Sequence, residues 1–209
     1  QNPEKVTVGP LLPANSPILS ALSLSTIYGI TNLSELGEEI FFERLKIALD
    51  NGLTMILVRE KQLATEDLLM FAERVIEIAG PYEAKVFIHS DIDLAKKLQA
   101  VGVHFTGQDL MQLSVKPQGI LCGASCHNSD ELAQAVKLGF DYVLLSPVQA
   151  TRSHVDAEPL GWDNFSDLIT GYTLPVYALG GMKAADLQNA RLHGAHGIAM
   201  QRDIWTDGF

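Results

Sequence analysis

The sequence predicts an α/β protein, a single (β/α)8 TIM barrel that follows an N-terminal Pro-rich leader. Short apolar runs alternate with segments whose apolar residues recur at helical spacing. The runs are continuously apolar, which is typical of strands buried on both faces of a parallel sheet. Eight such runs can be counted, in the strand-then-helix order of a barrel. A doubly wound open sheet is the alternative, but eight short strands with short helices close more easily than they lie open.

The first expected strand is β-branched and aromatic, covers residues 25–31 and ends before the turn residue Asn32. Further strands are expected at 53–58, 84–88, 101–104, 119–122 and 141–145, and the last two belong to a βαβ unit within 175–200. Helices are expected at about 35–50, 65–79, 91–100, 128–136, 162–170 and 183–192.

Three of the expected helices carry a residue at the start that could cap them. Thr65 begins the second helix. Asn128 with Glu131 matches a capping box, and Ser90 with Asp93 matches the same pattern. The buried stripe of the helix after Asn128 is expected to contain Leu132, Ala135 and Val136.

Residues 1–24 are predicted to be a linker, and residues 25–209 the barrel domain. Proline with few apolar residues is typical of a semi-rigid extended segment. The prolines of this leader are Pro3, Pro10, Pro13 and Pro17. Because the chain begins with Gln1, we expect that a further segment precedes it.

The composition argues against several classes of partner. A formal charge of −10 and an isoelectric point near 4.9 disfavour nucleic acid, whose phosphate backbone needs a basic surface. Apolar runs stay below the roughly 18 residues of a membrane helix, so no membrane partner is expected. Cys122 and Cys126 are too few for a disulfide framework or a zinc site, and they fit a reducing compartment. We therefore expect a cytoplasmic protein that binds any anion locally.

The pair Gly180 and Gly181 follows the first strand of the βαβ unit directly. Glycine lets backbone N–H groups approach a ligand, and the N-terminus of the following helix favours an anion. The loops after the seventh and eighth strands of such barrels commonly hold a phosphate. A phosphate site is therefore predicted here, and a Gly-Gly turn without a ligand is the alternative.

Basic and hydroxyl groups follow other strands. Arg59 and Lys61 occupy alternate positions after the second strand, where they could clamp a cluster of charged oxygens or could form a solvated strand end. The loop 146–154 holds hydroxyls and cations suited to a phosphate, and a mobile loop is the alternative. His127 precedes a capped helix, where a histidine serves either proton transfer or a structural hydrogen bond.

Together these motifs resemble the thiamin phosphate synthase and thiazole tautomerase (TenI-type) superfamily over roughly residues 26–205. The matching segments are Arg-Glu-Lys at 59–61, Gly-Val-His at 102–104, Ser-Cys-His with a following Glu at 125–131, Asp-Tyr at 141–142, Ser-Pro-Val with a following Thr at 146–151, and the glycine segments 175–182 and 197–199. The leader resembles the linker of chains in which this domain follows a Nudix hydrolase, so the resemblance implies an upstream Nudix domain. A homodimer is possible, and the sequence does not decide the oligomeric state.

The resemblance implies a transferase that couples a hydroxymethylpyrimidine pyrophosphate to a thiazole phosphate and releases pyrophosphate. Its substrates would be small phosphorylated heterocycles. It places Arg59 and Lys61 at the pyrophosphate and Asp109 as a ligand of Mg²⁺, because the leaving charge must be neutralised. Thr151, Ser153, Gly180 and Gly181 would bind the thiazole phosphate.

Four positions depart from the family's pattern. Leu57 replaces a Gln that addresses the pyrimidine, and Ser90 replaces a metal-binding Asp. His154 replaces a phosphate-binding Lys. Asp109 lies in Thr-Gly-Gln-Asp rather than in Gly-Gln-x-Asp, so its alignment could shift by one residue. The metal and pyrophosphate half of the site is therefore altered, whereas the phosphate half is largely kept.

Three functions from different classes follow, in this order. The first is the transferase, with Arg59 and Lys61 acting on pyrophosphate. The second is a thiazole tautomerase-type isomerase with His127 as acid and base, which needs the phosphate site but no metal. The third is a non-catalytic domain that binds a phosphate ester for an attached Nudix hydrolase.

Overall fold

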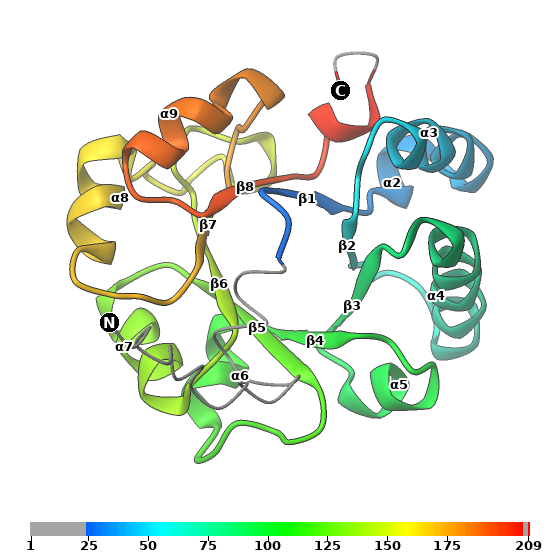
Figure 1. Cartoon of the computed structure of the whole chain (residues 1–209), viewed down its shortest axis with the longest axis horizontal. Helices are drawn as coiled ribbons and strands as arrows, with labels where there is room; N and C mark the ends of the chain where they lie inside the picture. The colour runs from blue at the N-terminus through cyan, green and yellow to red at the C-terminus, as the bar shows by residue number, and fades with distance from the viewer. Residues whose placement is uncertain (1–23, 207–208) are drawn as a thin grey trace, which may run out of the picture.

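A computed structural model describes residues 24–206 and 209, and these residues contain a closed barrel of parallel strands (Figure 1). Each strand pairs with the next along the chain, and the last pairs with the first. The predicted TIM barrel is thereby confirmed. The strands are β1 (Ile27–Ile30), β2 (Met55–Val58), β3 (Lys85–His89), β4 (Gly102–Phe105), β5 (Leu121–Cys126), β6 (Tyr142–Leu145), β7 (Val176–Ala178) and β8 (Gly197–Met200).

The helices form a ring outside the barrel (Figure 1). They are α2 (Leu33–Leu36), α3 (Glu38–Asp50), α4 (Thr65–Ala79), α5 (Ile92–Lys97), α6 (Gly107–Gln112), α7 (Ser129–Leu138), α8 (Gly161–Ile169) and α9 (Leu187–Leu192). Short 3-10 helices cover Gly80–Tyr82, Arg152–His154, Ala184–Asp186 and Asp203–Trp205. No helix within the described residues is long and apolar enough to cross a membrane. The leader was predicted at residues 1–24. Of these, only Leu24 belongs to the described residues, and residues 1–23 lie outside them.

Several predicted boundaries are wrong for local reasons. The expected helix 35–50 is two helices, because Gly37 adopts a positive φ of 75° between α2 and α3. The expected strand 119–122 is wrong by two residues at its start and four at its end. Gly119 turns the chain with a φ of 79° before β5 begins. Because β5 extends to Cys126, Ser125 lies inside a strand. Helix α6 was not predicted from the sequence.

Two of the three cap predictions are wrong. The N-cap of α4 is Ala64, one residue before Thr65, and no side chain caps that helix. Asp91 caps α5 by accepting a bond from the Leu94 backbone, so Ser90 is not the cap. Asn128 does cap α7, accepting from the backbone N–H of Glu131 at 2.9 Å.

The predicted stripe of α7 is correct at two positions and wrong at the third. Leu132 and Ala135 are fully buried, whereas Val136 is 40% exposed. Val136 follows Ala135 directly, so its side chain points further round the helix, to the solvent-exposed edge of the buried stripe. The buried face of this helix is therefore narrower than the spacing suggested.

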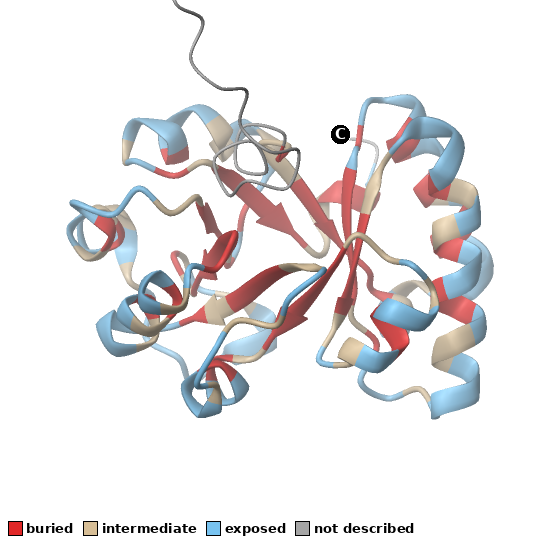
Figure 2. Ribbon diagram, turned by 60° about the horizontal axis from the view of Figure 1, so that its bottom comes forward, coloured by how far each residue is buried: buried red, intermediate tan, exposed pale blue. Residues whose placement is uncertain are grey.

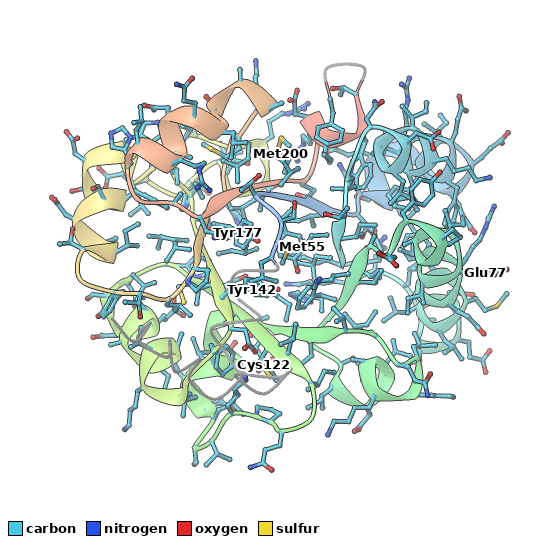
Figure 3. The ribbon with its side chains drawn as sticks, in the orientation of Figure 1. Met55, Glu77, Cys122, Tyr142, Tyr177 and Met200 are labelled. Atoms are coloured by element: carbon cyan, nitrogen blue, oxygen red, sulfur yellow. The ribbon has the colours of Figure 1, made fainter. Side chains whose placement is uncertain are left out.

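The core has two layers, one inside the barrel and one between the strands and the helices. Figure 2 shows buried strands surrounded by helices whose outer faces are exposed. Side chains alternate along each strand, so Tyr28 and Leu57 point inward while their neighbours pack under the helices. In Figure 3, Met55, Tyr142 and Tyr177 cluster at the centre of the ring, and Glu77 lies at its outer edge.

Aromatic rings fill the barrel interior because glycines on neighbouring strands leave them room. A Cβ atom on Gly123 would lie 2.0 Å from the ring of Tyr142, and one on Gly102 would lie 2.4 Å from Phe87. Tyr142 contacts Tyr28 edge to face, with centroids 5.5 Å apart, and Phe87 in the same way at 5.2 Å. The floor under the barrel mouth is thus rigid and aromatic.

We expect Gly123→Ala to lower the free energy of unfolding by about 1–3 kcal/mol or more, because the methyl group overlaps the Tyr142 ring. Gly80→Ala is the matched control. Gly80 has an α-helical φ of −53° and nothing within 4 Å of the added Cβ apart from its chain neighbours, so Gly80→Ala should change stability less than Gly123→Ala, although Pro81 crowds the new methyl group. Urea unfolding of both variants measures the difference, and equal stabilities would contradict this account of the interior.

Candidate active site

One pocket of about 560 Å³ opens at the carboxyl ends of the strands, and every strand or the loop after it contributes to its lining. This is the end at which barrel enzymes place their sites. We call it the mouth pocket. Of the predicted site residues it brings together Arg59, Lys61, His127, Thr151, Ser153, Gly180 and Gly181, and it adds His89, Ser125, His154 and Arg202.

Arg59 and Lys61 line the pocket, whereas the side chain of Glu60, which lies between them in the sequence, points away from it toward α2. Glu60 is 5% exposed, and its carboxylate accepts the backbone N–H of Leu33 at 3.1 Å, at the start of α2. The backbone N–H of Arg59 donates to the Thr31 hydroxyl at 3.0 Å, which fixes the loop to the end of β1. The buried carboxylate of Glu60 therefore stabilises the arrangement expected from the sequence, in which Arg59 and Lys61 lie on one side and Glu60 on the other.

Arg59 is partly buried in this wall, and the exposed Lys61 lies beside it. Burial lowers the pKa of Arg59, and burial together with the charge of Arg59 lowers the pKa of Lys61. Neither cation forms an ion pair with a carboxylate within the described residues. A bound anion would relieve both the desolvation and the mutual repulsion, so this wall suits a highly charged oxygen cluster.

His89, at the end of β3, lines the same wall. Burial, and then the charges of Arg59 and Lys61, lower its pKa from 6.5 to about 3, so the ring is neutral at physiological pH. Its Nδ1 lies 3.0 Å from the Ser90 hydroxyl. His89 is therefore a neutral hydrogen-bonding group placed among cations.

The opposite wall combines hydroxyls, glycines and a further arginine. Thr151 accepts the backbone N–H of Ser153 at 3.3 Å, and Arg202 Nη2 donates to the Ser153 hydroxyl at 2.9 Å. Arg202 also pairs with Glu35, with Nη2 and Oε1 2.8 Å apart. The bond from Arg202 lowers the pKa of Glu35. Arg202 thereby ties the loop after β6 to α2 and β8.

Gly180 and Gly181 take positive φ values of 109° and 67° and approach the loop after β6 closely. A Cβ atom would lie 2.9 Å from the backbone at Pro147 in the first case and at Ala150 in the second. Among the hydrogen bonds of the described residues, none uses the backbone N–H of either glycine as donor. Both glycines line the pocket, so their backbone N–H groups are candidates for binding an anion there.

His127 lies on the rim of the pocket and is paired with Glu131. Its Nδ1 is 3.0 Å from the Glu131 carboxylate, which also accepts the His127 backbone N–H at 2.8 Å. The imidazole is half exposed, whereas Glu131 is mostly buried against Gly107. A carboxylate at Nδ1 orients the ring and directs Nε2 away for proton exchange.

Asp109 is the predicted site residue that the structure does not place in the pocket. It is the third residue of α6, where its backbone N–H donates to the Thr106 hydroxyl, and its side chain is exposed. Thr106 and Gly107 line the pocket, but Asp109 does not.

The described residues contain no group of three or more His, Cys, Asp or Glu that could hold a metal ion. Ser90 and Asp91 are engaged elsewhere, as a partner of His89 and as the cap of α5. The residues present thus do not fit a metal site built by the protein alone. Mg²⁺ is commonly held by one or two carboxylates together with substrate phosphates, so its binding at Asp109 stays a prediction.

Sequence reasoning missed Arg202 and Glu35. Arg202 is the first cation after β8, a position that the rule for strand ends would have flagged. Glu35 lies on α2, a short helix that the pattern merged with α3, and no signal in the sequence marks it.

Comparisons with known proteins fit this arrangement. The family model described as thiamine monophosphate synthase matches residues 27–204. A putative thiamine-phosphate synthase 2 from Aquifex aeolicus is 33% identical over 180 residues, which is 85% of this chain and 96% of that protein. A thiamine-phosphate synthase from Desulfitobacterium hafniense is 31% identical over 180 residues, covering 84% of this chain and 86% of that protein.

Solved structures share the fold. A thiamine phosphate pyrophosphorylase from Pyrococcus furiosus superposes with a TM-score of 0.73 at 24% identity, covering 88% of this chain and 89% of that one. A thiamine phosphate pyrophosphorylase from Bacteroides thetaiotaomicron gives a TM-score of 0.61 at 19% identity, over 87% of this chain and 85% of that one.

The depressed pKa of His89 predicts a dependence of stability on pH. Between pH 6.5 and about 3 the unfolded chain binds a proton at this position that the folded chain does not, so the free energy of unfolding falls as pH falls. His89→Asn should therefore reduce the slope of unfolding free energy against pH by up to about 1.4 kcal/mol per pH unit in this window. Urea unfolding at several pH values measures both slopes. Above pH 7 the slopes should coincide, and identical slopes at pH 4–6 would contradict the neutral, desolvated histidine.

Proposed function

Because the chain belongs to the thiamine monophosphate synthase family, we propose that the mouth pocket is where this thiamin phosphate synthase-like transferase couples a hydroxymethylpyrimidine pyrophosphate to a thiazole phosphate. Pyrophosphate is the other product. The observation that supports this assignment is that one pocket has a wall with Arg59 and Lys61 and a separate wall with Gly180, Gly181 and Arg202. A reaction between two phosphorylated heterocycles needs that arrangement, since each substrate brings its own charge.

Arg59 and Lys61 bind the pyrophosphate. When the bond between the pyrimidine methylene carbon and the pyrophosphate oxygen breaks, negative charge grows on that oxygen. Cations already positioned in this wall, with Arg59 partly buried, stabilise this charge without having to reorganise. His89 is close enough to these cations for their charges to lower its pKa, and it remains neutral. It can therefore donate a hydrogen bond without adding further repulsion.

Gly180, Gly181, Thr151 and Ser153 bind the phosphate of the thiazole. The backbone N–H groups of the two glycines and the hydroxyls supply hydrogen bonds. Arg202, which already donates to Ser153, supplies the positive charge. Arg202 thereby provides a guanidinium on the wall where His154 replaces a lysine of the family's pattern.

The apolar floor between the two walls receives the rings. Leu57, Leu144 and Leu179 line it, and the aromatic interior lies beneath. Leu57 packs against a flat heterocycle but makes no polar contact with it. Ring recognition in this chain therefore relies on shape and on hydroxyl groups nearby, such as that of Ser125.

Four further expectations go with this function. Mg²⁺ at Asp109, a homodimer, an upstream Nudix domain and a cytoplasmic location all stay predictions. No step above depends on the metal. Addition of EDTA during the assay tests the first, and light scattering of the purified chain tests the second.

Neutralising a cation of the pyrophosphate wall should slow the coupling reaction. We expect Arg59→Gln and Lys61→Gln each to lower kcat/KM by about 10- to 100-fold, the value of one charge-assisted hydrogen bond. Lys97→Gln, an exposed lysine at the end of α5, is the matched control. The assay measures thiamin phosphate formed from both substrates with and without Mg²⁺. Full activity in both pocket variants, or no product from the unchanged protein, would overturn the assignment.

The His127–Glu131 pair favours a second candidate function, isomerisation of a thiazole carboxylate phosphate. This reaction moves a proton, and His127 Nε2 is directed away from the carboxylate and available for it. His127→Ala should lower this isomerisation about 10²- to 10⁴-fold. His193→Ala is the control and should leave it unchanged, because His193 follows α9, stacks on Trp162 and does not line the pocket. Isomerase activity that is undiminished in His127→Ala would exclude the second function. Phosphate-ester binding with neither activity would instead favour a non-catalytic binding domain.

A further inference from the structure

Four polar side chains form an unbroken hydrogen-bonded chain from the centre of the barrel to the mouth pocket. The Tyr28 and Tyr142 hydroxyls are 2.7 Å apart, and the Tyr142 hydroxyl is 2.8 Å from His104 Nδ1. His104 Nε2 lies 2.8 Å from the Ser125 hydroxyl. Ser125 lines the pocket. We call these four residues the relay, and none of them other than Ser125 reaches the pocket.

The three residues of the relay other than Ser125 are shielded from solvent. Tyr28, Tyr142 and His104 each have no exposed surface. Burial, and then the nearby His89 and the charge of Arg59, lower the pKa of His104 well below its ordinary value. His104 is therefore neutral, with one ring nitrogen that donates and one that accepts.

The number of protons available determines which atom of each pair in the relay is the hydrogen-bond donor. Among the described residues, Tyr142 is the only hydrogen-bond partner of the Tyr28 hydroxyl. If His104 Nδ1 carried the proton and donated to Tyr142, one of the two tyrosine hydroxyl protons would be left without an acceptor in the barrel core. Such a buried, unpaired donor is strongly disfavoured, because it has lost its hydrogen bond to water without gaining another.

The opposite direction leaves no donor unpaired. Tyr28 donates to Tyr142, Tyr142 donates to His104 Nδ1, and His104 Nε2–H donates to the Ser125 oxygen. The Ser125 hydroxyl then has its own proton free, and the pocket is the place where that proton can find an acceptor.

We propose that His104 is a positioning residue that makes the Ser125 hydroxyl a hydrogen-bond donor to the ligand. Ser125 therefore favours an acceptor atom, such as a phosphate oxygen or an unprotonated ring nitrogen, at the place toward which its hydroxyl proton points. This inference rests on the proposed function for its kinetic consequence, but not for the direction of the relay itself.

The direction can be measured in the unchanged protein without substrate. Two-bond ¹H–¹⁵N correlations of a histidine ring distinguish the protonated nitrogen from the unprotonated one. We expect His104 to carry its proton on Nε2 throughout pH 6–8. Tyr28→Phe is the control, because Tyr142 would still have to donate to Nδ1, and the tautomer should stay the same. A proton on Nδ1 in the unchanged protein would overturn the proposal whatever reaction the chain catalyses.

The kinetic consequence can be tested with two amides of different length. In His104→Gln an amide N–H can reach Ser125 in place of Nε2–H, whereas in His104→Asn the amide reaches only as far as Tyr142. We expect His104→Asn to lose turnover about as much as Ser125→Ala, and His104→Gln to recover at least tenfold over His104→Asn at a similar melting temperature. Adding Ser125→Ala to His104→Asn should cost little more. Equal loss in both amide variants, or full additivity with Ser125→Ala, would overturn the positioning role.

Failure of the proposed function gives a different result. In that case the unchanged protein would form no thiamin phosphate, and the tautomer of His104 would still support or overturn the direction of the relay.

Discussion

The packing of Tyr142 against Gly123 is the constraint on which the rest of the structure depends. The missing side chain on β5 leaves room for a whole aromatic ring from β6, and the ring contacts its neighbours edge to face. This packing closes the barrel axis below the mouth, so the interior is a solid floor rather than a channel. It also places a hydroxyl, not a methyl group, beneath His104. The same contact therefore determines both stability and the polarity of the floor.

Above that floor, a chain with a net charge of −10 builds a small positive site. Burying Glu60 under α2 turns Arg59 and Lys61 to the pocket side, away from any carboxylate partner among the described residues. Burial of Arg59 and its repulsion with Lys61 are unfavourable in the free protein, and a bound anion offsets both. Arg202 is different, because Glu35 partly neutralises it. The two walls thus differ in charge, which suits substrates that carry different numbers of phosphates.

The periodicity of the sequence was sufficient for the strand order, because buried parallel strands are continuously apolar and need no partner information to be recognised. Local geometry was predicted less well. Thr65 and Ser90 have the residue types of helix caps, but capping depends on where the backbone leaves the helix, and Ala64 and Asp91 occupy those positions. Val136 was assigned to the core from spacing alone, although the packing of α7 leaves it exposed.

The sequence by itself determined the barrel, the glycine pair that follows a strand, and the placing of Arg59 and Lys61 after another strand. These follow from properties that act within a few residues. Only the tertiary structure decided that Arg202 meets Ser153, that Asp109 lies off the pocket, and that a buried tyrosine orients Ser125 through His104. Contacts of this kind join residues from different strands and helices, and closure of the barrel alone brings them together.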